Sequence, residues 1–437
     1  MNPVLYKRIT AKDRRLDERL DAESYVFAPT ERGAWVALQD SKLRFKEGDR
    51  ITSEEAKQQG YFRPSSITNL RLDHRGLAPF PDTEGHRIVG IGDVVLSKFL
   101  PPKAAWVTSS TSRRPIDQNC IRIVGLKQAE GFWVANVLEH PNFQELLAKR
   151  STSSFIPRLG LGDLKSLRVP ETPVEAEGLA EGWSQATEKL FAAEDRLATL
   201  QEEVETYVAT EAPPFTAQQP QLYPAASFPD IWTPSYAGLK RFQAQVRAQG
   251  WEPIGRYLSD NTDRLREEVT EPVRVLHLRD ADGIFGFCTP EPDELRQATF
   301  RLFIMPLQED EVLLSVLGSA PKVVFHYPTS PARILLSDQW VRLESPTAPG
   351  ALALLLSARS TSWQLSLATI GMVQQFVPKS EFEHIHIPQL PVSMAERWDW
   401  QLRDYLEDVK NLHQQRNDIQ TEVRRLISLC TGETDDT

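Results

Sequence analysis

The chain carries an internal repeat, in which segments of its first half return 218 to 220 residues later. Residues 92–97 (Gly-Asp-Val-Val-Leu-Ser) correspond to residues 310–315 (Asp-Glu-Val-Leu-Leu-Ser), and residues 168–170 (Arg-Val-Pro) correspond to residues 386–388 (His-Ile-Pro). Because similar sequences fold alike, the repeat predicts two mixed α/β domains of one topology, related by pseudo-twofold symmetry within a single chain. Two such domains present two equivalent binding surfaces.

Shorter sequence matches between the two halves predict where helices and strands lie in the repeat. The run Arg-Ser-Thr-Ser occurs at residues 150–153 and 359–362, and we expect it to follow a helix in each half, at residues 141–149 and 349–358. A proline begins both of these segments, as is typical of a helix start. Short β-branched runs between turn residues predict strands. These strands are expected at residues 35–38, 94–96, 121–124, 273–276 and 323–325.

Each half ends in a helix with apolar heptads. Large apolar side chains recur in steps of four and three residues, a spacing that winds two helices around each other. We predict that the two helices pair with each other, and that Arg416 lies in their seam opposite an acidic residue, Glu188 or Glu194. The linker between the halves allows parallel and antiparallel pairing alike. The predicted coiled-coil seam contains Leu179, Trp183, Leu190, Leu197, Leu200, Val204, Leu402, Val409, Leu412, Arg416, Ile419, Val423 and Leu426.

These features predict an α+β protein with two mixed α/β domains separated by an intramolecular two-helix coiled coil. The expected parts are a first domain (1–170), a long heptad helix (171–211), a Pro-rich linker (212–230), a second domain (231–390), a second heptad helix (391–431) and a tail (432–437). Each domain is large enough to bury its own core.

The net charge of -10 is distributed unevenly along the chain. Residues 171–211 contain eleven acidic residues against Lys189 and Arg196, a net charge of -9, so the rest of the chain is close to neutral. Locally basic segments can therefore bind phosphate, because exposed charges are screened beyond about 8–10 Å. The three cysteines lie far apart, which disfavours disulfides and favours a reducing, cytoplasmic location. No stretch approaches the ~18 apolar residues of a membrane-spanning helix, and we expect no membrane contact.

The turn after each Val-Leu-Ser or Leu-Leu-Ser strand is the candidate DNA surface. Residues 94–122 have a net charge of +4 and residues 312–342 of +2. Lysine and arginine neutralise phosphates, and arginine, glutamine and asparagine read base edges. Polar turns and helix caps are the competing structural interpretation. Arg122 and Arg342 alternate with apolar strand residues, which favours a structural role. The candidate DNA-binding residues are Lys98, Lys103, Ser110, Ser112, Arg113, Arg114, Gln118, Asn119, Arg150, Ser151, Thr152, Lys322, His326, Arg333, Arg359, Ser360 and Thr361.

Catalytic, metal and cofactor sites are disfavoured. Residues 212–215 (Ala-Pro-Pro-Phe) are the nearest match to the Asn/Asp-Pro-Pro-Tyr/Phe motif of amino-methyltransferases, but alanine cannot accept a hydrogen bond from the target amine. Residues 90–92 (Gly-Ile-Gly) precede a strand instead of following one, opposite to the order in a cofactor-binding loop. His384 and His386 alternate along the chain without an evident third metal ligand. We predict no catalytic residue, no metal and no cofactor bound by this chain.

Taken together, the motifs resemble those of the specificity subunits of type I restriction–modification systems, or of a related defence or modification system. The resemblance covers nearly the whole chain. Each motif is weak singly, and their order and duplication make the combination specific. In place of the family's Glu-Gln pair just inside each helix, this chain has Glu175-Ala176-Glu177 and Met394-Ala395-Glu396. The matching segments are residues 19–25 (Arg-Leu-Asp-Ala-Glu-Ser-Tyr), 92–98, 151–159, 164–170 and 385–391.

This resemblance implies two target-recognition domains and an antiparallel coiled coil, in a subunit that performs no chemistry itself. It implies double-stranded DNA as the ligand and two DNA methyltransferase subunits as partners, which would bind S-adenosylmethionine and methylate adenine. A restriction–translocase subunit can join such complexes. The competing interpretation is a coiled-coil protein-interaction scaffold of a defence complex, without its own DNA readout. The acidic face of the first helix is either a solvated face or a docking surface for protein.

Overall fold

The structure of the chain is a computed structural model. It describes residues 34–40, 43–68, 70–73, 77, 80, 88–109, 114–150, 158–212, 234–259, 274–276, 278, 305–306, 309–317, 322–326, 334–336, 339–370 and 376–431. The fold divides into two compact units. Unit 1 comprises Met1–Phe191 and Leu412–Thr437, and unit 2 comprises Ala192–Asn411. The predicted α+β class with two long helices packed together is confirmed.

Unit 1 is built around a four-stranded antiparallel sheet in the order β2-β7-β5-β6. Its described elements are β1 (Trp35–Ala37), η2 (Leu38–Asp40), β2 (Arg44–Glu47), α2 (Ser53–Gln58), η3 (Pro64–Ser66), β3 (Ile67–Thr68), β4 (Arg71–Leu72), β5 (Val94–Ser97), β6 (Ala104–Trp106), β7 (Cys120–Val124), α3 (Gln128–Glu139), α4 (Pro141–Arg150), α5 (Leu161–Lys165) and β8 (Arg168–Pro170). All four residues of β5 are buried, because both faces of the sheet are covered.

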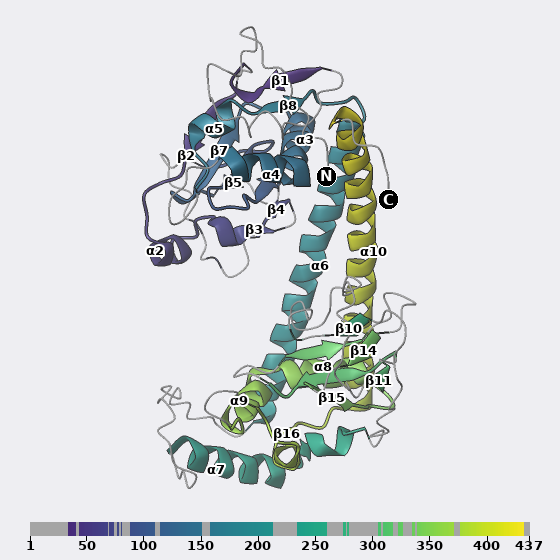
Figure 1. The fold of residues 1–437 in the computed structure, drawn as a ribbon. Coiled ribbons are helices and arrows are strands. Elements are labelled where there is room, and N and C mark those ends of the chain that lie inside the picture. Colours follow the sequence, from purple (N-terminus) through teal and green to yellow (C-terminus); the bar gives the residue numbers. More distant parts are fainter. Residues whose placement is uncertain are drawn as a thin grey trace, which may run out of the picture. The chain divides into compact units, whose positions relative to one another are not determined.

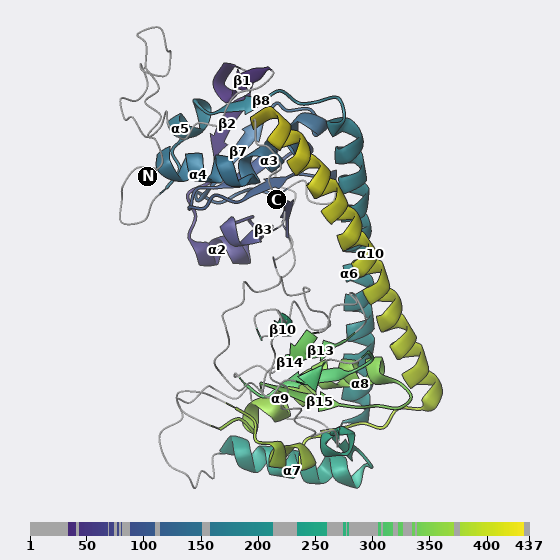
Figure 2. The same cartoon turned by 45° about the vertical axis from the view of Figure 1, so that its right-hand side comes forward.

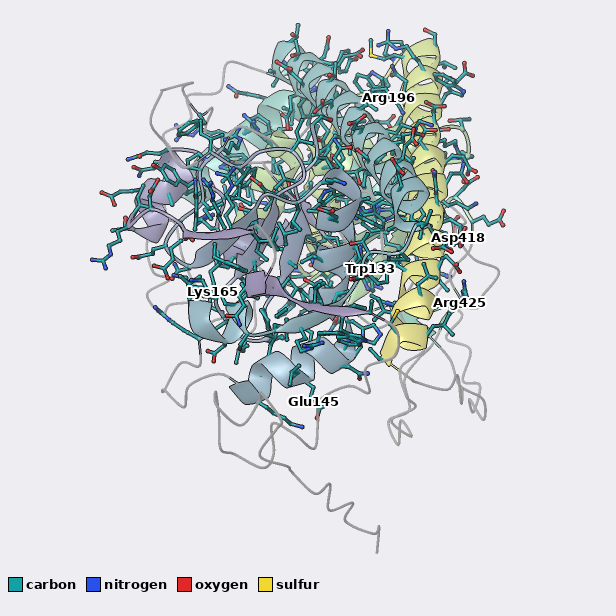
Figure 3. The ribbon with its side chains drawn as sticks, turned by 90° about the horizontal axis from the view of Figure 1, so that it is seen from above. Trp133, Glu145, Lys165, Arg196, Asp418 and Arg425 are labelled. Atoms are coloured by element: carbon teal, nitrogen blue, oxygen red, sulfur yellow. The ribbon has the colours of Figure 1, made fainter. Side chains whose placement is uncertain are left out.

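The core of unit 1 includes parts of both long helices. The fully buried Trp133 of α3 donates its indole N–H to the carbonyl of Pro170, 2.9 Å away, and lies inside the unit (Figure 3). Phe132 packs against Trp183 of the helix α6 (Ala176–Glu211). Val423 and Ile427 of the helix α10 (Val392–Thr431) belong to the same cluster. The globular part and the two helices of unit 1 therefore form one hydrophobic core.

Unit 2 contains a three-stranded antiparallel sheet in the order β13-β12-β15, the counterpart of β6-β5-β7. Its described elements are α7 (Pro234–Ala248), β9 (Glu252–Pro253), η5 (Ile254–Tyr257), β10 (Arg274–Leu276), β11 (Met305–Pro306), β12 (Val312–Ser315), β13 (Val323–Phe325), β14 (Ile334–Leu336), β15 (Trp340–Leu343), α8 (Pro349–Ser357), α9 (Arg359–Leu367), η6 (Lys379–Glu383) and β16 (His386–Ile387). Strands at all five predicted places are confirmed across the two units, whereas α7 was not expected from the sequence.

The repeat is reproduced in the backbone conformation of the two units. The residue two positions before each central strand, Gly92 in unit 1 and Asp310 in unit 2, has a positive φ of 88° and 64°, respectively. Glycine and aspartate both tolerate this left-handed conformation. The last strands also correspond, because β8 pairs with β1 and β16 pairs with β9, both antiparallel. The same turn and the same pairing therefore occur in both halves.

An Arg-Ser-Thr-Ser run follows a helix in both units, as expected, but the two helices are not equivalent in the repeat. Two helices follow the sheet in each unit, α3 and α4 in unit 1 and α8 and α9 in unit 2 (Figure 1). Arg150 is the last residue of α4, but Arg359 is the first residue of α9. The runs lie 209 residues apart, not 218, so their local similarity does not reflect equivalent places in the fold. Helix α8 corresponds to α3, which the sequence analysis did not predict.

Helices α6 and α10 pair in antiparallel fashion within each unit, as the resemblance implied (Figures 1 and 2). In unit 2, Arg196 forms an ion pair with Asp408, and farther along α6 the ring of Tyr207 packs edge-on against Trp398. In unit 1, Ala176, Ala180 and Trp183 share a core with the C-terminal part of α10. The residue number rises along one helix as it falls along the other, which requires opposite directions.

Most of the buried positions of the two long helices follow the heptad pattern. Of the predicted seam residues, Trp183, Leu190, Leu200, Val204, Leu402, Leu412, Arg416 and Val423 are buried, and Leu179, Leu197, Val409, Ile419 and Leu426 are partly buried. In α10, two of the buried residues, Leu406 and Ile427, lie one position after a residue of the heptad pattern. There the helix packs on a globular core, and a straight helix drifts by about 20° per heptad from a strict 3.5-residue repeat.

Arg416 is buried in the seam opposite an aromatic ring. Its guanidinium carbon lies 4.2 Å from the ring centroid of Trp183, and the residue is 4% exposed. Of the two acidic partners predicted for Arg416, Glu188 accepts a hydrogen bond from the Ser109 hydroxyl, and a pairing with Glu194 stays a prediction. A cation over an indole face is stabilised by the ring quadrupole, so the seam can hold this charge.

Candidate nucleic-acid interface

The structure describes only some of the candidate DNA-binding residues. The described ones fall on three places: the turns after β5 and β12, the turn before β7, and the start of α9. Lying outside the described residues are Ser110, Ser112, Arg113, Ser151, Thr152, Arg333 and the side chain of Arg150. Residues 19–25 and most of the linker also lie outside them.

The turn after the central strand has the same hydrogen bonds in both units. The Ser97 hydroxyl accepts the backbone N–H of Lys103 at 2.8 Å, and the Ser315 hydroxyl accepts that of Lys322 at 2.7 Å. The lysine side chains differ, because Lys322 donates from Nζ to the Leu278 carbonyl at 2.8 Å while the side chain of Lys103 is exposed. The duplicated turn therefore presents one exposed lysine in unit 1.

Lys98 is less accessible than its sequence suggested. Its Nζ lies 2.7 Å from a Glu47 carboxylate oxygen on β2, and its side chain is only 14% exposed. The Glu47 carboxylate offsets the positive charge of the Lys98 ammonium, so this lysine attracts a phosphate less strongly than an unpaired lysine would. Lys98 therefore ties the turn to the sheet.

The turn before β7 contains one exposed candidate. Gln118 is exposed, with Nε2 3.4 Å from the Ile51 carbonyl. Asn119 donates to the Asp117 carboxylate from its backbone and side chain, and Arg114 donates from Nη1 to the Gly60 carbonyl at 3.0 Å. Burial raises the pKa of Asp117, which the bonds from Asn119 oppose. Asn119 and Arg114 thus hold the turn in place, and Gln118 is left at its surface.

The candidates around α9 divide into exposed and buried groups. The Arg359 side chain is 92% exposed, although its backbone N–H donates to a Glu205 carboxylate oxygen on α6 at 2.8 Å. Thr361 is 1% exposed and donates to the Leu355 carbonyl, and His326 is 7% exposed. Ser360 is half-buried. Thr361 and His326 therefore differ from the expectation, because buried side chains cannot touch DNA in the folded chain.

Two buried ion pairs hold the duplicated sheets together. Arg122 Nε of β7 lies 2.5 Å from an Asp93 carboxylate oxygen, and Arg342 Nη2 of β15 lies 3.2 Å from a Glu311 carboxylate oxygen. All four side chains are at most 11% exposed. The expected structural role of the two arginines is consistent with this placement. Each pair connects the residue directly before a central strand, Asp93 before β5 or Glu311 before β12, to the neighbouring strand, β7 or β15.

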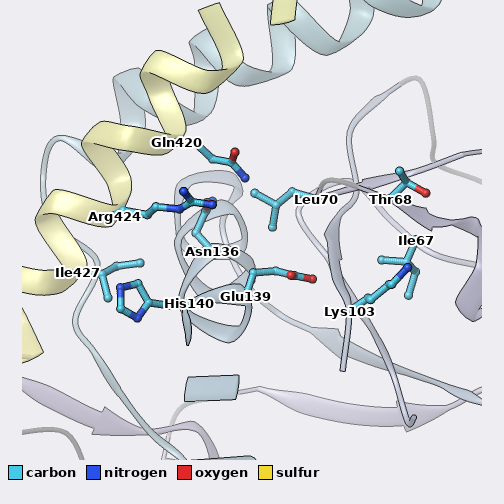
Figure 4. A pocket seen from close by; sticks show the side chains of 10 residues that line it. All are labelled: Ile67, Thr68, Leu70, Lys103, Asn136, Glu139, His140, Gln420, Arg424 and Ile427. Carbon is cyan, nitrogen blue, oxygen red and sulfur yellow. The ribbon is translucent and has the colours of Figure 1, made fainter. Parts of the chain in front are cut away.

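A pocket of unit 1, which the sequence did not predict, lies between the globular part and α10 (Figure 4). Its volume is about 270 Å³. Lys103, Asn136 and Glu139 line it from the globular part, and Gln420 and Arg424 line it from α10. Only Lys103 was a candidate residue. The pocket has no sequence signature, because the residues on its two sides lie about 300 positions apart in the chain.

Glu139 is the acidic group of this pocket. Its carboxylate accepts the backbone N–H of Ala104 on β6. Burial raises the pKa of Glu139 above its ordinary value, while the Ala104 bond and the Lys103 ammonium lower it. Burial is the largest of these influences, so the carboxyl is harder to ionise in the folded chain than in the unfolded chain.

The pKa shift of Glu139 predicts a pH-dependent stability. The stabilisation from this group is complete below its ordinary pKa of 4.5 and is lost as the pH rises through the higher folded-state pKa. Glu139→Gln removes this titration and keeps an oxygen for the Ala104 N–H. Its thermal midpoint relative to wild type should therefore rise between about pH 4 and about pH 7 in calorimetric scans. Glu145→Gln, at an exposed position of α4, controls for loss of one negative charge, and a flat difference for Glu139→Gln would contradict the prediction.

Within the described part of the chain, no three or more histidine, cysteine, aspartate or glutamate side chains gather closely enough to hold a metal ion. His386 Nδ1 lies 2.9 Å from the His384 carbonyl, and burial lowers its pKa. In the same part of the chain, no helix has the length and apolar character needed to cross a membrane.

Comparison with known proteins finds similarity among solved structures. No protein-family model and no curated protein matches the chain. It is similar to the type I restriction–modification S subunit from M. genitalium, with 13% identity, coverage of 92% of this chain and 96% of that one, and a TM-score of 0.44. The HsdS subunit from Thermoanaerobacter tengcongensis has 14% identity, coverage of 91% and 95%, and a TM-score of 0.25. A protein described in connection with complex assembly and conformational transition of the type I restriction–modification system has 14% identity, coverage of 91% and 96%, and a TM-score of 0.27.

Proposed function

We propose that the chain is the non-catalytic DNA-recognition subunit of a modification system. Each unit reads one half of a bipartite double-stranded target, and the chain directs a partner adenine-N6 DNA methyltransferase to that target. Two methyltransferase subunits supply S-adenosylmethionine and the chemistry, and a restriction–translocase subunit joins where the system also cleaves. The boundaries proposed for the two recognition domains are residues 1–170 and 231–390.

The duplicated strand-and-turn unit carries this proposal. The turn bonds recur at Ser97 and Ser315, and the bond from the Lys98 N–H to the Asn119 carbonyl recurs between Val316 and Gln339, at 2.8 and 2.9 Å. Equivalent surfaces in one chain suit a ligand with two comparable sites, and double-stranded DNA offers these on successive turns.

The exposed candidates have the chemistry of DNA contact. Lys103 and Arg359 can neutralise phosphates, which positions a protein on the duplex without reading sequence. Gln118 has an amide that can pair with the N6 and N7 edge of adenine in the major groove. The acidic surface of α6 should repel DNA and suits a protein partner.

Methylome sequencing tests this function. The full-length chain, expressed with its methyltransferase in cells that lack adenine methylation, should place methyl groups in one bipartite motif with a fixed gap. Exchanging residues 117–119, which include Gln118, for a foreign turn should alter one half of the motif, and exchanging the equivalent residues 337–339 should alter only the other half. Each exchange serves as the matched control for the other. Loss of both halves from either exchange would contradict separate readout.

A protein scaffold predicts the opposite results. The complex would then methylate without dependence on the two turns, or not at all. It would show no DNA affinity to lose as the ionic strength rises, whereas the affinity of a DNA reader falls steeply, because binding releases counterions and this release is less favourable at high salt. Measuring affinity at several salt concentrations with the partner present separates the two functions.

A further inference from the structure

The pocket between Lys103 and Arg424 has the chemistry of a phosphate site. We propose that it binds one phosphate group of the DNA backbone and so connects domain 1 to α10 during recognition. This inference rests on the proposed function, because the phosphate comes from the DNA that the chain reads. It adds a contact from the second long helix to those expected from the turns.

Two cations line this pocket from opposite sides and from distant parts of the chain, with Glu139 between them (Figure 4). Lys103 extends from the start of β6, and Arg424 extends from α10 toward Asn136 (Figure 4). Both residues are exposed, and among the described residues neither side chain has a hydrogen bond or ion pair. The Glu139 carboxylate offsets one of these two positive charges, and the net positive charge that remains attracts an anion.

The remaining polar groups complete a site for an oxyanion. Gln420 and Thr68 line the pocket with an amide and a hydroxyl that can donate hydrogen bonds. Arginine grips two phosphate oxygens with its planar guanidinium, and lysine adds a point charge. The Glu139 carboxylate is turned to the Ala104 N–H, so it opposes an anion less than a free carboxylate would. The net charge of these groups remains positive.

The described residues at the equivalent place in unit 2 differ from those of the pocket. In the repeat, the positions of Glu139 and His140 are taken by Ser357 and Ala358, at the end of α8. Directly after it, the first residue of α9, Arg359, donates its backbone N–H to Glu205 of α6, an acidic residue. An acidic neighbour does not favour phosphate. The two halves therefore differ in how a long helix contributes to the DNA-facing surface.

Salt-dependent DNA binding tests the pocket. The full-length chain, purified with its methyltransferase subunits, is titrated with a duplex containing its methylated motif at several salt concentrations. Lys103→Gln with Arg424→Gln should weaken binding about 10-fold. The double variant should lower the slope of log affinity against log salt by about 0.9, the value for one phosphate. Non-target duplex should be affected equally, because a phosphate contact carries no sequence information.

Arg425→Gln is the matched control. Arg425 is the next residue of α10, and its guanidinium lies 2.6 Å from Glu422 on the side of the helix (Figure 3). This variant should keep the wild-type slope. The single variant Arg424→Gln, at an exposed helix position, reports on the pocket independently of the turn that contains Lys103.

The possible results distinguish a failure of the phosphate-pocket proposal from a failure of the proposed DNA-reading function. If the double variant keeps the wild-type slope of log affinity against log salt, the single-phosphate pocket is overturned. A decrease of about 1.8 in that slope would overturn it as well, because it corresponds to two phosphates. Either result leaves the DNA-reading function intact. A wild-type complex without any affinity for DNA would overturn both. Inorganic phosphate that raises the thermal midpoint of wild type but not of Arg424→Gln, with unchanged DNA slopes, would assign the pocket to free phosphate.

Discussion

Arg122→Met is expected to destabilise unit 1 by about 3–5 kcal/mol, because it leaves the carboxylate of Asp93 buried without its cation. Asp93 is 5% exposed, and its remaining bond is from the Gly90 N–H at 2.6 Å. Methionine fills much of the volume of the arginine side chain, so loss of packing contributes little. A calorimetric scan of the full-length chain measures the effect. The two units can unfold in separate transitions, and calorimetry resolves the transition of unit 1 from that of unit 2.

The double variant separates the ion pair from general damage to the sheet. Asp93→Asn with Arg122→Met should cost clearly less than the sum of the single changes, because neither side chain is then left with a buried charge. Arg342→Met removes the equivalent cation beside Glu311 and should lower the stability of unit 2. Additive costs for Asp93 and Arg122 would show that their contact contributes nothing to stability.

Removing one heptad from each long helix is expected to shorten the gap between the half-sites by about three base pairs. The helices contain 36 and 40 residues and run from one unit into the other. Seven helical residues correspond to about 10 Å, and a base pair to about 3.4 Å. Deleting residues 192–198 and 408–414 removes Arg196 and its ion-pair partner Asp408 together. Methylome sequencing reads the new gap directly.

A deletion in only one helix is the control for the paired deletion. It shifts one helix by seven residues against the other in part of the pair, so seam residues no longer face their partners. Methylation should then be lost instead of moved to a new motif. A paired deletion that methylates the original motif with its original gap would refute the idea that the helices set the spacing.

Strands and long helices could be predicted because their signals are local. Val94 to Ser97 form a short β-branched run that needs burial on both sides, and a strand in the centre of a sheet supplies it. Trp183, Leu190 and Leu200 lie seven and ten residues apart, on the pattern of alternating three- and four-residue steps, and all three are buried. The helix α3 was missed because it is apolar on all sides, with eight consecutive buried residues and no polar face.

The candidate site was predicted less well, because residue type does not determine what a side chain contacts. Lys98 and Lys103 lie in one turn and look alike in sequence, yet one is held by Glu47 and the other is exposed. Thr361 lies in a run shared with residues 150–153, but its hydroxyl serves a helix end. A matching run of four residues is too short to establish equivalent positions without the strand pairings around it.

The duplication could be read from the sequence, because it appears when the chain is compared with itself. The α+β class and the pair of heptad helices could be read as well, because each depends on the periodicity of apolar residues over a few neighbouring turns. The residues left the direction of helix pairing open, although the resemblance implied it, and the tertiary structure alone decided the place of Arg416 over Trp183 and the lining of one pocket by Lys103 and Arg424. These features join residues more than 200 positions apart. Their contacts arise from packing of whole helices against a core, for which no local pattern of residues is a signal.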